Sequence, residues 1–95
     1  MNIRELKSGI GSISLQAKVL YMGEKKIIEK YGRKLAVLEI VIADKSGEIP
    51  LTLWNSDCDR VAVGNEVIIS NAYCNEWQGK RQLTLGKYGT MEVIE

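Results

Sequence analysis

The sequence predicts a single all-β domain, a five-stranded closed barrel with Greek-key topology and one short helix between the third and fourth strands. Three observations predict it. The 95 residues suffice for one domain with a single modest core, and we expect that domain to span residues 1–95. Segments of strand length alternate apolar with polar residues, and turn-forming Gly, Asp and Asn separate them. The composition, 45% hydrophobic and 26% charged, is ordinary for a globular protein.

The first three strands are expected over residues 14–22, 34–43 and 48–54. The first is half-buried, with its apolar face made by Leu15, Ala17, Val19 and Tyr21. The second, KLAVLEIVIA, is β-branched and nearly continuous, which indicates cover on both faces for part of its length. The third, EIPLTLW, alternates between two faces, with Ile49, Leu51 and Leu53 inward and Pro50, Thr52 and Trp54 outward.

A short helix is expected next, within NSDCDRVAVGN. Asn55 or Ser56 can cap its start, acidic Asp57 and Asp59 suit its first turn, and Gly64 ends it after roughly seven residues.

The fourth and fifth strands are expected over residues 65–73 and 80–86, and residues 1–12 are expected to form an arm across one end of the sheet. This order fits the OB-fold; the SH3-like barrel, the nearest competitor, lacks a helix at this place.

Several classes of function find no support in the sequence. No apolar run approaches the roughly 18 residues of a membrane span, and the N-terminus lacks the apolar region of a secretory signal. Cys58 and Cys74 lie sixteen positions apart in a chain without histidine, which excludes the common zinc spacings. We interpret them as incidental thiols of a reduced, intracellular protein. Because no nucleophile motif or phosphate loop is present, we expect no catalytic residue, metal or cofactor.

The net charge is only +1, so any electrostatic argument depends on where the charges lie. The connection over residues 23–34, with Tyr31–Gly32 at its tip, carries five basic and two acidic residues, a local charge of +3. It is either a solvated hairpin or a cationic loop of a binding site. Residues 76–87 carry a local charge of +2, from Lys80, Arg81 and Lys87 against Glu76.

Three large rings, Trp54, Tyr73 and Trp77, fall at outward or turn positions of this pattern. The alternatives are that Trp54 folds back over the edge of the barrel and that the other two rings tuck into the core. Bases stack on exposed rings, and phosphates need a positive groove. Outward rings between two cationic loops therefore favour binding of single-stranded nucleic acid.

Three segments together resemble a known family: DKSGEIPLTLW (44–54), VAVGNEVIISNAY (61–73) and WQGKRQLTL (77–85). They are similar to the single-OB-fold single-stranded DNA-binding proteins of archaea, related to eukaryotic DNA-damage sensor subunits and replication protein A domains. The likeness runs from residue 6 to about residue 88. It implies that Trp54, Tyr73 and Trp77 stack on bases. Some relatives carry a further aromatic where this chain has Gly86, with Tyr88 close by. Members often continue into a partner-recruiting tail, and we expect none within residues 1–95.

We therefore expect sequence-tolerant binding of single-stranded DNA in replication, recombination or repair, by a cytoplasmic, nucleoid-associated protein that is not an enzyme. The rings named above stack on bases, and the residues expected at the phosphates are Lys18, Arg33, Lys80, Arg81 and Lys87. Two alternatives stay open. One is an OB module that binds RNA or tRNA, and the other is an OB-fold subunit that buries its rings against a protein partner.

Overall fold

The computed structural model describes residues 2–85 and 89–94, and for Ser56, Asp57 and Trp77 it describes the backbone alone. The strands in this part of the chain are β1 (Ile13–Met22), β2 (Lys26–Lys30), β3 (Arg33–Asp44), β4 (Gly47–Trp54), β5 (Glu66–Trp77), β6 (Lys80–Thr84) and β7 (Thr90–Val93). Two short 3-10 helices accompany them, η1 (Ile3–Glu5) before β1 and η2 (Asn55–Asp59) between β4 and β5.

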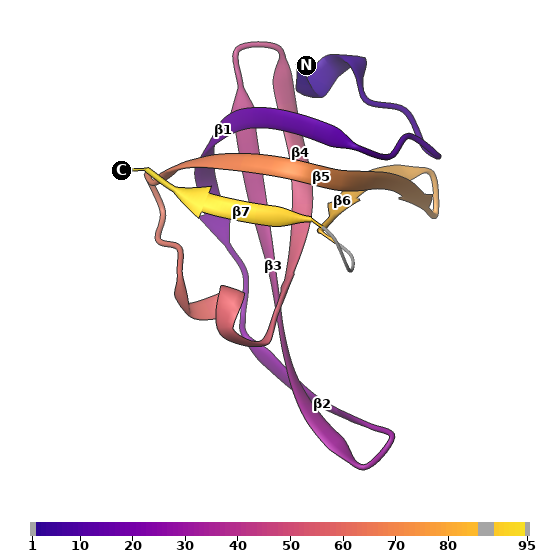
Figure 1. The fold of residues 1–95 in the computed structure, drawn as a ribbon, viewed down its shortest axis with the longest axis vertical. Helices are drawn as coiled ribbons and strands as arrows, with labels where there is room; N and C mark the ends of the chain where they lie inside the picture. The colour runs from indigo at the N-terminus through magenta and orange to yellow at the C-terminus, as the bar shows by residue number, and fades with distance from the viewer. Residues whose placement is uncertain (1, 86–88, 95) are drawn as a thin grey trace.

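Five of these strands close a ring of backbone pairings in the order β1, β3, β4, β6, β5 and back to β1. Within the ring β4 and β6 run parallel, whereas the other neighbouring strands run antiparallel. Figure 1 shows β1, β5 and β7 passing across β3 and β4, so that two layers of the ring face each other. The predicted all-β OB-fold class is confirmed.

The core fills the space between these layers. In β4 the inward side chains of Ile49, Leu51 and Leu53 are at most 1% exposed, as the alternation predicted. In β1 the corresponding side chains are Leu15, Ala17 and Val19. Burying one leucine, isoleucine or valine side chain contributes about 1.5–3 kcal/mol. No polar or charged residue is buried among those that the structure describes.

Tyr21, expected on the core side of β1, is instead 62% exposed. The register between β1 and β3 shifts between Val19 and Tyr21, so Val19 pairs with Ile42 and Tyr21 with the adjacent Val41. One extra residue in a strand moves every later side chain to the opposite face. The assignment of Tyr21 to the core was therefore wrong, because the bulge reverses the alternation at this point.

Two strands were not among the five predicted, although a hairpin was one of the two alternatives for residues 23–34. The connection after β1 forms β2, which pairs with the start of β3 around the expected tip, where Tyr31 and Gly32 have φ values of 53° and 73°. Two successive positive φ values define the type I′ turn of a tight hairpin. Figure 1 shows this β2–β3 hairpin projecting away from the body of the domain. The second strand, β7, pairs with β5 over residues 67–70, ahead of the part of β5 that pairs with β6, and its Met91 side chain belongs to the core.

The expected helix is shorter than predicted, a 3-10 helix of five residues. Asn55, expected as its cap, has a φ of 54°, and its Oδ1 accepts a hydrogen bond from the backbone N–H of Ala36 at 3.3 Å. The Asn55 side chain thus ties η2 to β3. Gly64, expected to end the helix, lies farther on, and its N–H donates to the carbonyl of Val19 at 2.8 Å.

The N-terminal arm lies over one end of the ring, with η1 beside the β3–β4 turn (Figure 1). The side chains of Ile3 and Leu6 are almost fully buried there. The backbone N–H of Ile3 donates to Asp44 Oδ2 at 2.9 Å. Farther along the arm, the N–H of Cys74 in β5 donates to the carbonyl of Ile10 at 2.8 Å. Side-chain burial and backbone hydrogen bonds therefore both hold the arm on the domain.

Candidate nucleic-acid interface

One row of residues crosses the outer side of four neighbouring strands. Its members pair directly in the register: Tyr73 in β5, Thr84 in β6, Thr52 in β4 and Glu39 in β3. Direct cross-strand partners point to the same face of a sheet. Since the next residues along β4 and β6, Leu51 and Leu83, are fully buried, this row lies on the outside of the ring.

A second row continues this outer face onto the projecting hairpin. Trp54 at the end of β4 pairs with Val37 in β3, and Val37 pairs on its other side with Lys26 in β2. Trp54 is 40% exposed although its neighbour Leu53 is completely buried. The indole therefore lies outside the core, two positions along β4 from Thr52 of the first row.

Tyr73 is 44% exposed at the other end of the first row. A Cβ atom at Gly11 would stand 3.6 Å from Cδ2 of the tyrosine ring, so the arm lies against this ring and Gly11 leaves room beside it. Beyond Tyr73, β5 continues to Trp77, which occupies the register position opposite Lys80 of β6. The turn between them, Gln78–Gly79, has φ values of 51° and 78°, again a type I′ turn.

The hairpin supplies cations on the same side as Trp54. Lys26, Ile28 and Lys30 alternate along β2, and Lys30 pairs with Arg33 of β3. These residues share the face of Val37, the partner of Trp54. At the tip, Tyr31 is 91% exposed, and Lys30 Nζ lies 5.5 Å from the centroid of its ring. At the base, Lys25 Nζ and Asp59 Oδ1 form an ion pair at 3.1 Å, which links the hairpin to η2.

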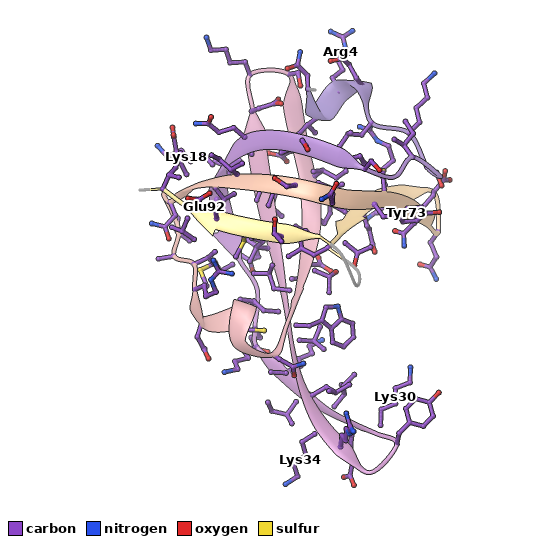
Figure 2. All side chains as sticks on the ribbon, in the orientation of Figure 1. Arg4, Lys18, Lys30, Lys34, Tyr73 and Glu92 are labelled. Carbon is purple, nitrogen blue, oxygen red and sulfur yellow. The ribbon has the colours of Figure 1, made fainter. Side chains whose placement is uncertain are left out.

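The structure does not bring all the expected cations to this face. The Arg81 guanidinium donates from Nη1 to the backbone carbonyls of Ile3, at 3.4 Å, and of Leu6, so it holds the arm. Lys18 is labelled on the opposite side of the domain from Tyr73 in Figure 2. Lys87, like Gly86 and Tyr88, lies outside the described residues.

One residue of this face, Glu39, was missed in the sequence, and the face that Lys26 and Tyr31 occupy was not predicted. Lys26 and Tyr31 were noted as parts of a charged loop, yet only the β2–β3 register shows that Lys26 shares a face with Trp54. Glu39 interrupts the apolar run of β3, and this single charge was the available signal. Among the described residues, no group of three or more His, Cys, Asp or Glu is placed to hold a metal ion. None of the described helices is long and apolar enough to cross a membrane.

The fold and this face define an OB-fold domain whose outer sheet surface carries exposed rings beside a cationic hairpin. Over residues 8–93 the chain matches the family described as single-stranded DNA binding protein Ssb-like, OB fold, and it belongs to that family. The single-stranded DNA binding protein Ssb of Saccharolobus solfataricus is 27% identical over 84 residues, which cover 88% of this chain and 57% of that protein. This chain therefore spans little more than half the length of that curated relative.

Solved structures show the same fold. The OB domain of Ta0387 from Thermoplasma acidophilum superimposes with a TM-score of 0.83 at 21% identity, covering 100% of this chain and 86% of that one. A chain of the replication protein A heterotrimer bound to single-stranded DNA gives a TM-score of 0.79 at 19% identity, covering 99% of this chain and 24% of that one. At these identities the similarity demonstrates the fold alone.

Proposed function

We propose that this domain binds single-stranded DNA with little dependence on base sequence, along the outer face defined by the two rows and the hairpin. The observation that carries the proposal is the pair of large rings, Trp54 and Tyr73, which the fold leaves 40% and 44% exposed on one face. Large apolar side chains exposed together on one face indicate a ligand-binding surface. Membership of the Ssb-like family and the DNA-binding names of its relatives support the same ligand.

Binding in this proposal combines stacking with charge neutralisation. Bases stack on Trp54 and Tyr73, and each contact is worth about 1–3 kcal/mol. Trp77, four residues after Tyr73 at the end of β5, provides a third ring. Lys26, Lys30 and Arg33 neutralise phosphates on one side of the path, and Lys80, opposite Trp77 in the register, does so on the other. Because each neutralised phosphate of a single strand contributes about −0.7 to the log–log salt slope, binding weakens steeply with salt.

None of these contacts depends on the identity of a base, because every nucleotide has a flat base and a phosphate. Such binding suits protection of single strands exposed during replication, recombination or repair, and it would place the protein with the nucleoid DNA of the cytoplasm. The proposal contains no catalytic step and no cofactor.

The test is a fluorescence titration with a short oligo-dT, since the chain has two tryptophans to report the contact. Trp54→Ala should weaken binding by about 1–3 kcal/mol, and Trp54→Phe, which keeps a ring, should recover most of this loss. Urea denaturation of each variant controls for unfolding. A loss below about 0.5 kcal/mol in the alanine variant, or no quenching in the wild-type protein, would contradict stacking.

The same experiment separates the two alternatives. Preference for a matched RNA oligomer in competition would favour the RNA-binding module. Failure to bind either oligomer, together with a dimer or larger species in sedimentation, would favour a subunit that covers its rings with protein.

A further inference from the structure

A single carboxylate lies in the middle of this proposed interface. Glu39 is exposed on β3, whereas its neighbours Leu38 and Ile40 are at most 2% exposed, so the glutamate side chain points outward. No hydrogen bond or ion pair joins the Glu39 carboxylate to another residue in the described part of the chain. Its hydrogen-bonding capacity is therefore open to a ligand.

Glu39 lies next to the indole in the strand register. It pairs directly with Thr52 of β4, and Trp54 is two positions farther along that strand. Such diagonal neighbours lie roughly 7–8 Å apart, within reach of a long side chain and an aromatic ring. A base stacked on the indole of Trp54 can therefore turn its hydrogen-bonding edge towards the Glu39 carboxylate.

A carboxylate in this position discriminates among ligand groups. It repels phosphates, which keeps the DNA backbone on the cationic side of the path. It only accepts hydrogen bonds, so it favours base edges that donate. The Watson–Crick edge of guanine offers two adjacent N–H donors that match two carboxylate oxygens, whereas cytosine offers one amino group next to an acceptor. Thymine presents one N–H between two carbonyl oxygens, which the carboxylate repels.

We propose that Glu39 confers a local base preference on the site at Trp54, for guanine first, then cytosine, and against thymine. The preference rests on the proposed function, and it adds one selective position to an otherwise tolerant path. Reading of Watson–Crick edges beside stacked bases is a general mode of recognition in single-stranded nucleic acids.

The test uses a set of short oligo-dT molecules that carry a single guanine or a single cytosine at each position in turn. A bidentate contact to a base is worth about 1–3 kcal/mol, so we expect one guanine position to raise wild-type affinity about fivefold or more. Glu39→Gln should remove this gain, because the amide offers one acceptor and one donor to two donors of guanine. Plain oligo-dT should bind the variant at least as well as the wild-type protein.

Glu92→Gln is the matched control, since it makes the same charge change on β7, on the opposite side of the domain from Tyr73 (Figure 2). It should leave the guanine preference unchanged. Equal wild-type affinity for all the oligomers would overturn the role of Glu39 while leaving the proposed function intact. An equal gain for all oligomers in Glu39→Gln would likewise reduce Glu39 to a repulsive charge. No binding of any oligomer to the wild-type protein would refute the proposed function itself.

Discussion

Arg81 and Lys80 are neighbours in one cationic segment, yet their side chains make different contacts in the structure. The Arg81 guanidinium donates to the carbonyls of Ile3 and Leu6 in the N-terminal arm. Lys80 is exposed at the start of β6 and pairs with Trp77 of β5. Replacing each residue by alanine should therefore separate stability from DNA binding. We expect Arg81→Ala to destabilise the domain and Lys80→Ala to weaken binding.

The size of the Arg81 effect follows from its contacts. A hydrogen bond from a charged group contributes about 1.5–3 kcal/mol, and a carbonyl left without its donor adds to the loss. Both bonds here come from the same nitrogen, Nη1, so their contributions do not add fully. We expect Arg81→Ala to lower the free energy of unfolding by about 2 kcal/mol, a large fraction of the roughly 5–15 kcal/mol of a typical domain.

Two measurements distinguish the variants: urea denaturation, and the salt dependence of oligo-dT binding. Lys80→Ala should leave the free energy of unfolding within about 0.5 kcal/mol of wild type and make the salt slope shallower by about 0.7. Arg81→Ala, measured where it is folded, should keep the wild-type slope. The opposite result, a shallower slope without loss of stability in Arg81→Ala, would refute the assignment of Arg81 to the arm.

Two further predictions concern the titratable groups. Burial by itself raises the pKa of Asp44, but hydrogen bonds from Ser46, Ile3 and Gly47 outweigh it and hold this pKa below the ordinary value of 3.8. A lowered folded-state pKa stabilises the protein above the unfolded pKa, and this contribution disappears as the pH falls through the folded value. Asp44→Asn should therefore flatten the loss of stability below about pH 5 in denaturation series, and an unchanged pH profile would contradict this role. The Cys74 thiol is fully buried, and burial raises its pKa. A thiol reagent should therefore modify it only at the rate of unfolding, and fast labelling of the native protein would contradict its burial.

The sequence was most informative where one face of a strand is buried and the other is exposed. In β4 the apolar residues Ile49, Leu51 and Leu53 at every second position predicted both the core and the outward direction of Trp54. The position of the Tyr31–Gly32 turn was also predicted, because Gly32 adopts positive φ without a steric cost. The all-β class followed from several such local signals.

The sequence was less informative where pairing partners decide the outcome. KIIEK of β2 shows no alternation of burial, since all five residues are exposed, and its strand conformation depends on pairing with β3. Tyr21 lies on the opposite face from the predicted one because of a bulge between Val19 and Tyr21, and no residue type in β1 indicates this bulge. Asn55, a good helix cap by type, instead bonds to a strand that is distant in the sequence.

The sequence by itself determined the class of the fold and the rings available for stacking, because periodicity and turn chemistry are local properties of the chain. Only the tertiary structure decided which charges accompany those rings. Closure of the ring through β4 and β6 places Trp54 and Tyr73 on one face, and the arm engages Arg81. Register sets Glu39 beside the proposed path, since side-chain neighbours across strands are chosen by pairing and not by position in the sequence.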